Sequence, residues 1–504
     1  MKKTRFLSAL LAALMLVAPL ASCANGDDPV ETGDKVTNDT NSEEDTGVHD
    51  DLPSSLDYDK AKITIISRDL EGWTRGEISV DGITSEPVND AIFERNRMVE
   101  SRLNITFNSI LDPDAGSGTV PSKVAKAVKA GTNEYDIMAA CAYTTAPESL
   151  KGTFANLRNT EYLDFDKPYW TQGYNEAMEY DGMQFSATGS MLLSIYRFAF
   201  VTVFNKDLFT NANQPFLYDT VEEGAWTLDK QISLVPLFHK DNGNGIQDET
   251  GDTYGFISSR LISTDAYWSS CQVDIVTKNT DGELVLVFDS GKLYDVAEKV
   301  LQLYYGTDDG TYSMPSKAGD AEQADIRKMF SNNLGAMATL RIMELENSEM
   351  RNMESEYGVI PMPKFDEKQD GYYTLLHDQF TVVAVPTTVK GERLDMVSAV
   401  LEALSSVSYK IVKPAYYEET LRTKIAKDPQ SAQMMDIITE GIFIDAGIIY
   451  TDAFDSFQNG LRDIVGNKNN DAVSRFKTKL VIAEKGLKRK IVGMFEKIAS
   501  QQPQ

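Results

Sequence analysis

The stretch EYDIMAA, residues 134–140, is a short run in which apolar side chains follow one another closely. Such a run is typical of a strand that is buried on both faces of a sheet. Two β-rich runs precede it, AKITIIS at 61–67 and LNITFNSI at 103–110. Amphipathic helical patterns separate the three runs, so the sequence predicts a βαβαβ unit, the beginning of an open α/β sheet.

The helices and the strand ends of this unit can be placed from the sequence. Ser85 and Pro87 begin the first helix, and the second covers 121–130. In open α/β sheets, ligands bind outside the carboxyl ends of the strands. The candidate binding loops are therefore 68–73 and 141–145.

The N-terminal residues have the pattern of an export signal. Basic residues precede the apolar run 6–20, which is too short to span a bilayer as a helix. The run is followed by LASC, which resembles a bacterial lipobox and predicts a lipoprotein signal peptide at 1–22, with Cys23 as the acylated residue. An ordinary signal peptide with Cys23 nearby by chance is the alternative.

The segment 23–55 is predicted to be an acidic, flexible tether. From 24 to 55, ten acidic residues face a single cation, Lys35, and apolar side chains are scarce. Such a segment cannot bury enough surface to offset its ordering entropy, and its charges repel one another. We expect it to hold the folded part of the chain away from the membrane.

Composition and charge limit the class of protein. A chain of 504 residues with 42% hydrophobic residues is long enough for two lobes. The formal net charge of −27 argues against nucleic acid and against anionic lipid as partners. Besides Cys23 the chain has Cys141 and Cys271, which we expect to be buried thiols in different lobes rather than a disulfide.

Short motifs in a fixed order carry a family resemblance. They run from YDIM through FVTVFNKDLF, WTLDKQ, DTYGF, MFSNNLGAMATL, YGVIPMPKFD and FTVVAVP to PAYYEETL. In this order the chain resembles the extracellular solute-binding proteins of ABC importers, in the group that includes maltose-binding protein, above all the long Gram-positive lipoproteins. The resemblance implies a two-lobed periplasmic-binding-protein-like α/β fold with a hinge and an interlobe cleft.

The resemblance also implies where the chain crosses between the lobes. The N-lobe is expected to hold 56–190 and 360–410, and the C-lobe is expected to hold 191–359 and 411–504. The cleft should then lie between two sheets and close on a ligand by hinge bending.

Candidate ligand-binding residues follow from the resemblance and from side-chain type. Aromatic faces with a few polar groups suit a carbohydrate, whose CH-rich faces pack on rings while its hydroxyls form directional hydrogen bonds. The candidates are Arg68, Trp73, Tyr143, Thr144, Tyr196, Arg197, Tyr267, Trp268 and Arg341. Any single aromatic ring among them could instead belong to the core, and Trp226 is assigned to packing.

The expected function is capture of a solute rather than catalysis. The resemblance implies a lipid-anchored, monomeric subunit that delivers a sugar or oligosaccharide to the permease subunits of an ABC importer, with no required cofactor. Only three histidines occur, too few for a histidine-rich zinc site or an obvious catalytic triad. The alternative is a surface-anchored glycan-binding protein or glycan hydrolase, because 76 acidic residues leave a glycosidase-like carboxylate pair open.

The stretch HKDNGNGIQDETGDTYGF, residues 239–256, resembles a calcium-binding loop. Counting from Lys240 as the first position puts Gly245 at the sharp turn. The predicted ligands are Asn242, Asn244, Ile246, Asp248 and Glu249. A lysine and two neutral asparagines stand where such a loop has acids, so a calcium ion here would bind weakly and serve a structural role. A glycine-asparagine turn without an ion is the alternative.

Overall fold

The computed structural model describes residues 47–113, 116–287, 290–315, 321–425, 428–468 and 472–501. Met1–Thr46 and Gly47–Gln504 are separate units. The predicted export signal, the predicted acylation of Cys23 and most of the predicted tether therefore lie outside the described residues.

The C-terminal end of the predicted tether belongs to the folded unit, which corrects its boundary at residue 55. Leu52 is 8% exposed and is part of a hydrophobic cluster. The guanidinium of Arg102 pairs with Asp50 at 2.6 Å. One apolar side chain and one ion pair thus hold this short stretch on the body of the protein.

The strands alternate with helices along most of the chain. The strands are β1 (Ala61–Arg68), β2 (Ile105–Asp112), β3 (Ile137–Cys141), β4 (Phe200–Asn205), β5 (Tyr254–Ser259), β6 (Val276–Lys278), β7 (Leu284–Leu286), β8 (Thr311–Met314), β9 (Gly335–Arg341), β10 (Tyr357–Ile360), β11 (Thr374–Leu375), β12 (Thr381–Ala384) and β13 (Ile442–Phe443).

The helices include several short ones and two π-helical segments, η3 and η5. They are α1 (Pro87–Leu103), α2 (Thr119–Ala130), α3 (Ala142–Ser149), η1 (Leu157–Asn159), α4 (Gln172–Met178), α5 (Ser194–Arg197), α6 (Lys206–Asn211), α7 (Tyr218–Glu222), α8 (Leu228–Leu234), η2 (Val235–Leu237), α9 (Ile262–Ser270), α10 (Ser290–Tyr305), α11 (Ala321–Ser331), α12 (Ile342–Leu345), α13 (Ser348–Arg351), α14 (Glu392–Pro414), η3 (Ala415–Ile425), α15 (Pro429–Glu440), α16 (Ala446–Ile449), η4 (Thr451–Phe454), α17 (Asn459–Asn467), α18 (Ala472–Gly486), η5 (Leu487–Val492) and α19 (Gly493–Gln501).

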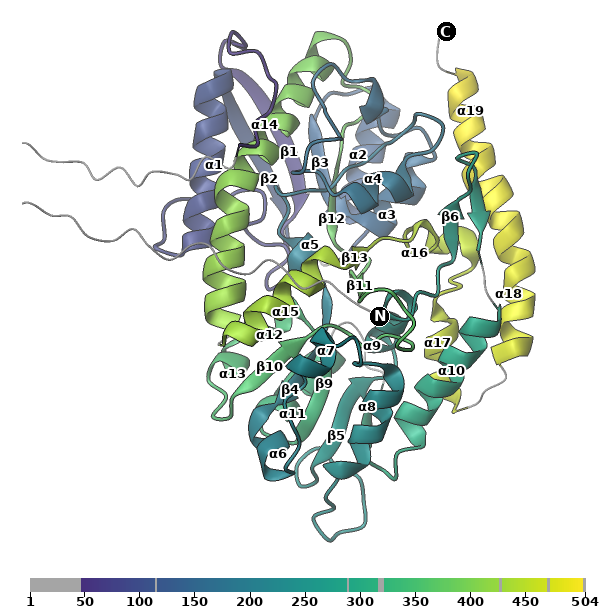
Figure 1. Cartoon of the computed structure of the whole chain (residues 1–504). Coiled ribbons are helices and arrows are strands. Elements are labelled where there is room, and N and C mark those ends of the chain that lie inside the picture. The colour runs from purple at the N-terminus through teal and green to yellow at the C-terminus, as the bar shows by residue number, and fades with distance from the viewer. Residues whose placement is uncertain are drawn as a thin grey trace, which may run out of the picture. The chain divides into compact units, whose positions relative to one another are not determined.

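Four strands form a first sheet in the order β12-β3-β1-β2 (Figure 1). β1 pairs in parallel with β2 and β3, and β12 pairs antiparallel with β3. Alternate side chains point to opposite faces. Ile65 shares a hydrophobic cluster with Val99 of α1 and Val400 of α14, whereas Ile66 shares another with Val124 of α2. The predicted βαβαβ unit is confirmed.

Five strands form a second sheet in the order β10-β4-β9-β5-β8. β5 is parallel to β8 and β9, and β4 is antiparallel to β9 and β10. Every residue of β4, β5 and β9 is buried, as expected for strands that are covered on both faces. The two sheets occupy different halves of the described unit in Figure 1. The residue boundaries of the lobes stay a prediction.

The segment 472–501, here called the C-terminal strap, contacts structure around both sheets. Phe476 of α18 packs edge-on against Trp268 of α9, with ring centroids 6.1 Å apart. Phe495 of α19 stacks on Phe185 at 5.6 Å, next to Ala187, which bridges to β12 of the first sheet. The π-helical segment η5 lies between these two anchor points.

Cys141 and Cys271 are both buried thiols. No helix among the described residues is both long enough and apolar enough to cross a membrane.

Candidate functional site

Carboxyl ends of strands from both sheets meet around one tryptophan ring. Arg68 ends β1, and Arg341 ends β9. The guanidinium carbon of Arg341 lies 4.9 Å from the centroid of the Trp73 ring, and that of Arg68 lies 5.5 Å from it. These are cation–π distances. Because Trp73 follows β1, the contact shows that the carboxyl edges of the two sheets face each other.

His377 lies beside this ring, at 5.7 Å between ring centroids. Its side chain is buried, and Nδ1 forms no hydrogen bond with any described residue. Burial, and then the charges of Arg341, Arg462 and Arg68, hold the pKa of His377 well below its usual value. The ring is therefore neutral at neutral pH. A buried polar atom without a partner is costly, so a ligand group that hydrogen-bonded to Nδ1 would be stabilised.

Two aspartates and an arginine complete this group of side chains. Arg462 of α17 holds both oxygens of Asp265 of α9, with Nε 2.7 Å from Oδ1. Burial and then the charge of Asp265 raise the pKa of Asp378 to about 7, against the opposing effect of Arg462 and Arg341. Near neutral pH, Asp378 can thus donate a hydrogen bond as well as accept one.

These side chains are here called the interlobe cluster. Its members are Arg68, Trp73, Asp265, Arg341, His377, Asp378 and Arg462.

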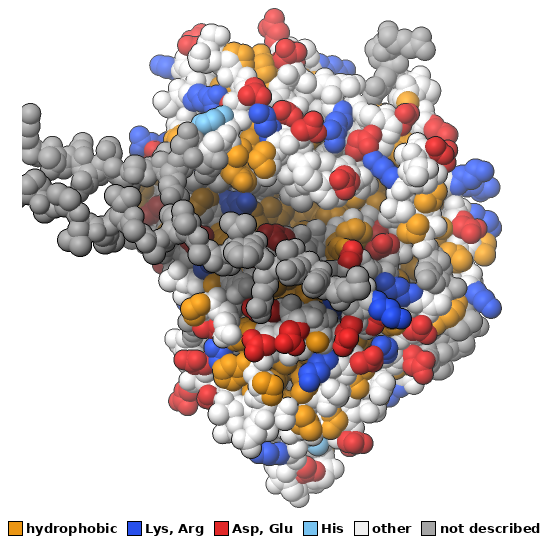
Figure 2. Space-filling view, in the orientation of Figure 1, with side chains coloured by type: hydrophobic (Ala, Val, Ile, Leu, Met, Phe, Trp, Pro, Cys, Tyr) orange, Lys and Arg blue, Asp and Glu red, His pale blue; other side chains and the backbone are white. Residues whose placement is uncertain are grey.

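A very small cavity borders the cluster. Its volume is about 10 Å³, and its walls include Asp265, Trp268, His377 and Asp378. That is no more than one water molecule needs. Figure 2 shows the surface hollowed between the two halves of the described unit, with acidic and basic side chains at the margin. At the cluster itself, the protein's own side chains fill the space, so a sugar could enter only if the two edges separated.

Tyr143 and Thr144 lie next to the cluster, at the start of α3. The main-chain N–H of Tyr143 donates to the carbonyl of Asp378 at 3.3 Å, and its hydroxyl lies 2.5 Å from that of Ser117. The hydroxyl of Thr144 donates to the carbonyl of Ser117 at 2.9 Å. The structure therefore places both predicted residues at the border, where they fix the loop before α2.

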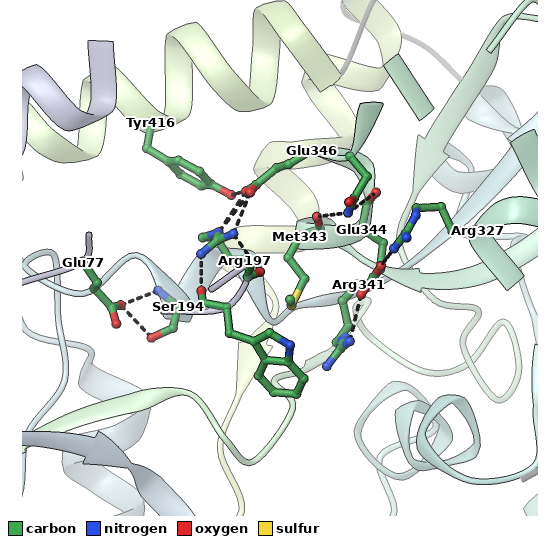
Figure 3. Close-up of polar contacts among 12 residues, drawn as sticks. Glu77, Ser194, Arg197, Arg327, Arg341, Met343, Glu344, Glu346 and Tyr416 are labelled. Atoms are coloured by element: carbon green, nitrogen blue, oxygen red, sulfur yellow. Dashed lines mark hydrogen bonds and ion pairs between the residues drawn. The ribbon is translucent and has the colours of Figure 1, made fainter. Parts of the chain in front are cut away.

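Arg197 connects the two sides of the molecule (Figure 3). Its Nη2 lies 2.8 Å from Oε2 of Glu346, just after α12, and its Nη1 donates to the carbonyl of Trp73. The hydroxyl of Tyr416 donates to the same Glu346 at 2.7 Å. The nearby Glu346 carboxylate raises the pKa of Arg197, against the effect of burial. Arg197, a predicted ligand residue, therefore binds other groups of the protein in this structure.

A buried acid fixes the loop after β1 from its other end. Glu77 accepts hydrogen bonds from the main-chain N–H of Ser194 at 2.7 Å and from its hydroxyl at 2.8 Å (Figure 3). The hydroxyl of Thr381 in β12 donates to the same carboxylate at 2.7 Å. Burial raises the pKa of Glu77. The loop that carries Trp73 is therefore tied to α5 and to the first sheet.

Two predicted aromatic residues, Tyr196 and Tyr267, lie away from the cluster, and their role toward a ligand stays a prediction. Tyr196 is 7% exposed, packs 6.0 Å from the ring of Tyr416, and borders a different pocket together with Lys413. Tyr267 is fully buried, with its hydroxyl 3.3 Å from Oε1 of Gln231. Neighbouring residues on a helix point about 100° apart, so Tyr267 and Trp268 cannot face the same space.

Trp268 reaches the cavity, but other contacts fix its ring. It is fully buried, and its Nε1 donates to the carbonyl of Gln458 at 2.9 Å. The ring also packs against Phe457 and Phe476. In this structure Trp268 is a wall of the cavity and an anchor of the C-terminal strap. A stacking role toward a ligand stays a prediction.

The predicted ligand residues do not include Asp265, His377, Asp378 or Arg462. Asp265 comes two positions before Tyr267, so its place beside the predicted rings was a usable signal. His377 is one of only three histidines. No local pattern distinguishes Arg462 from the other cations of the chain.

The loop at 239–256 is stabilised by its own hydrogen bonds. Asp248 accepts from the main-chain N–H groups of Thr250 and Gly251 at 2.8 and 2.6 Å and from the side-chain amide of Asn244 at 2.9 Å. These bonds hold the pKa of Asp248 well below its usual value. Glu249 accepts from the hydroxyl of Tyr312 at 3.0 Å.

The predicted calcium ligands fit the ion poorly in this arrangement. Of the two predicted acidic ligands, Asp248 is engaged by hydrogen bonds within the turn, and Glu249 is bound to Tyr312 outside it. Among the described residues, no group of three or more His, Cys, Asp or Glu is arranged to hold a metal ion. Calcium binding by this loop stays a prediction, and it requires Glu249 to leave Tyr312.

No protein-family model matches the chain, and no curated protein matches it either.

Solved structures of ligand-binding proteins share the fold. The galacto-N-biose-/lacto-N-biose I-binding protein of an ABC transporter from Bifidobacterium longum, in complex with lacto-N-biose, has a TM-score of 0.57 and 14% identity over 85% of this chain and 98% of its own. The maltose/maltodextrin-binding domain MalE from Bdellovibrio bacteriovorus, bound to maltotriose, has a TM-score of 0.53 and 14% identity, with 85% and 100% covered. UgpB from Mycobacterium tuberculosis, in complex with glycerophosphocholine, has a TM-score of 0.54 and 13% identity, with 86% and 99% covered.

These similarities establish the architecture. The two-lobed α/β fold expected from the sequence resemblance, that of the solute-binding proteins of ABC importers, is confirmed. The three proteins are in complex with different solutes, and their identity to this chain is only 13–14%. They therefore identify neither its ligand nor its ligand-contacting residues.

Proposed function

We propose that the chain captures a sugar or an oligosaccharide between its two sheets and delivers it to the permease subunits of an ABC importer. The interlobe cluster carries this proposal. It contains the ring of Trp73 with two guanidinium groups and His377 beside it, and Asp378 next to His377. A ring offers its face to the CH groups of a sugar, and the charged groups suit its hydroxyls. Capture in this form needs no cofactor.

We also propose where the protein works. An acyl group on Cys23 would anchor it to the cell membrane, outside the cytoplasm, with the acidic segment as a tether. The lipobox-like LASC sequence supports the anchor. The protein would act as a monomer and bind its solute without converting it, a role that the binding proteins of the same fold support.

Capture would require the two halves of the protein to move apart and close again. The cavity of about 10 Å³ at the cluster is too small for a sugar ring. Hinge bending of two lobes about their crossover segments is the motion that this fold permits. The contacts of Arg68 and Arg341 with Trp73 would then be exchanged for contacts with the ligand.

A thermal-shift screen over sugars, oligosaccharides and peptides, with mass spectrometry of any co-purified solute, tests the proposal. We expect one class of solute to raise the melting temperature and to be recovered unchanged. The Asp378→Asn variant should bind that solute at least about tenfold more weakly, the scale of a lost hydrogen bond to a charged group. Asp81→Asn, at an exposed position on the first-sheet side, is the matched control and should bind normally.

Two results would contradict the proposal. One is the absence of binding by any class of solute in the screen. The other is release of a cleaved product from a glycan, which would favour the hydrolase alternative. Equal affinity of both variants would move the binding site away from the interlobe cluster.

A further inference from the structure

The C-terminal strap differs in charge from the rest of the chain. Residues 472–501 contain eight Lys and Arg against two Glu, although Asp and Glu outnumber Lys and Arg by 76 to 49 in the whole chain. At physiological salt, exposed charges are screened beyond about 8 Å. A partner at this surface therefore responds to the local positive charge rather than to the net charge of −27.

Four of these cations lie on the exposed side of α18 and η5. Lys477, Lys485 and Lys488 follow one another at helical spacing, Arg489 is adjacent, and all four are exposed. None of the four forms a hydrogen bond or an ion pair with a described residue. By contrast, Lys479 on the same helix donates to a main-chain carbonyl at 3.0 Å. In a chain with so many acids, four adjacent cations are left for an external partner.

Two large apolar side chains lie among these cations. Val481 is 50% exposed and Ile482 is 40% exposed. The other side of the strap is buried through Phe476, Ala483 and Leu487, so the exposed pair does not contribute to the core. The exposed side, here called the basic face, consists of Lys477, Val481, Ile482, Glu484, Lys485, Lys488 and Arg489, so that four cations outnumber one exposed acid.

We propose that the basic face binds the anionic lipid surface of a membrane. Lysines that surround aliphatic side chains on an exposed helix are typical of helices that lie on such a surface, where cations approach lipid phosphates and aliphatic groups enter the interface. The prediction from net charge that excluded anionic lipid as a partner overlooked this local concentration of cations.

The proposed acyl anchor, on which this inference leans, would bring the face close to lipid. A segment of the length of 23–46 spans at most about 80 Å even when fully extended. The folded unit would thus stay near the membrane at a high effective concentration, and a weak contact would be sufficient for docking.

Co-sedimentation with lipid vesicles tests the inference. The full chain with Cys23→Ala, which carries no acyl group, is mixed with vesicles of phosphatidylcholine alone or with about 30% phosphatidylglycerol. We expect at least about tenfold tighter binding to the anionic vesicles, and loss of that difference at about 0.5 M salt. The basic residues of the predicted export segment would also favour anionic vesicles, but this contribution is the same in all variants, so the comparison between variants decides the test.

Two matched variants separate the basic face from net charge. Changing the four cations of the face to Glu should reduce the preference for anionic vesicles at least about tenfold relative to the unaltered chain. A control changes four other exposed lysines to Glu and alters net charge by the same amount. These lysines are Lys62, Lys126, Lys129 and Lys390. The control should keep the preference for anionic vesicles, and circular dichroism melting should show that both variants are folded.

Two outcomes would overturn the inference. One is equal binding of the unaltered chain to both lipid mixtures, and the other is an equal loss of binding in the two variants. Binding to native membranes that protease treatment abolishes, without binding to pure lipid vesicles, would indicate a protein partner instead. Solute affinity should be the same in all three proteins, so failure here leaves the proposed capture function intact.

Discussion

The buried side chain of Glu402 in α14 makes the stability of the fold depend on pH. It is 1% exposed, the hydroxyl of Tyr169 donates to its Oε1, and Nε1 of Trp170 donates to its Oε2 at 3.1 Å. Burial raises its pKa from 4.5 to about 7, although these hydrogen bonds oppose the shift. Between these two values the folded state binds more protons than the unfolded state. The contribution of Glu402 to stability is therefore greatest below pH 4.5 and is lost as the pH rises through about 7.

Glu402→Gln should reduce this pH dependence. The amide oxygen can accept from Trp170 while the amide nitrogen donates to the Tyr169 oxygen, so the packing is kept. We expect the free energy of unfolding to fall less between about pH 5 and about pH 7.5 than in the unaltered chain, by up to about 3 kcal/mol. Urea unfolding at both pH values measures this change in the free energy of unfolding. The exposed Glu94→Gln is the control. Identical pH slopes for the two variants would contradict the assignment.

Single residues also show how far the sequence leads to the site. Arg68 and Arg341 were predictable because each directly follows a strand pattern, and the carboxyl ends of strands are where ligands collect. Asp265 and Arg462 come from helices almost 200 positions apart, and only tertiary packing brings them into contact. Tyr267 lies away from the interlobe cluster, because side-chain type identifies aromatic residues but does not give their direction on a helix.

At the scale of elements, Gly486 controls how closely α18 approaches η4. A Cβ at this position would lie 1.9 Å from the carbonyl oxygen of Ala453. Gly486→Ala should therefore force the strap away from its support and destabilise the protein by about 1–3 kcal/mol, as overpacking does. Gly466→Ala is the matched control, because a Cβ there meets open space on a helix, where alanine is favoured by up to about 1 kcal/mol.

Thermal unfolding of the two glycine variants distinguishes the outcomes. A lower melting temperature for Gly486→Ala, with an unchanged or higher one for Gly466→Ala, is the expected result. If both variants melt as the unaltered chain does, the close approach of α18 to η4 does not limit stability.

The elements differ in how well sequence patterns identify them. β1 and β3 were predictable because short apolar runs between helical patterns leave few alternatives. The paired two-residue strands β11 and β13 were not, since each is too short to leave a pattern and its partner is distant in the sequence. The π-helical segments η3 and η5 have no local signature either, because a widened turn depends on what the helix packs against.

At the scale of the whole molecule, a few contacts decide how easily the two halves separate. Arg197 binds Glu346, which follows the second sheet, and also the carbonyl of Trp73, which follows the first. Tyr416 binds the same Glu346 from η3. Hinge opening would have to break this chain of contacts at one point, and the hydrogen bond from Arg197 to the carbonyl of Trp73 is the link that joins the two predicted lobes.

Glu346→Gln should shift the protein toward an open form. The neutral amide loses the charge interaction with Arg197 but retains the size of the side chain, and a loss of about 1.4 kcal/mol would raise the ratio of open to closed molecules tenfold. Without ligand, we expect a larger radius of gyration in small-angle scattering than for the unaltered chain. Saturating solute should compact both proteins to the same value, because a ligand favours the closed form.

Glu349→Gln is the control for Glu346→Gln, because it removes an ion pair that does not lie between the two halves. Glu349 binds Nε of Arg327 at 2.6 Å, and both residues lie on the second-sheet side, so this pair does not join the two halves. Its variant should melt at a lower temperature without a change in the radius of gyration. Solute affinity should fall severalfold for Glu346→Gln alone, since the closed form that holds the ligand is less populated. An unchanged radius and affinity for Glu346→Gln would mean that the contacts of Trp73 with Arg68 and Arg341, rather than the Arg197 ion pair, hold the two halves together.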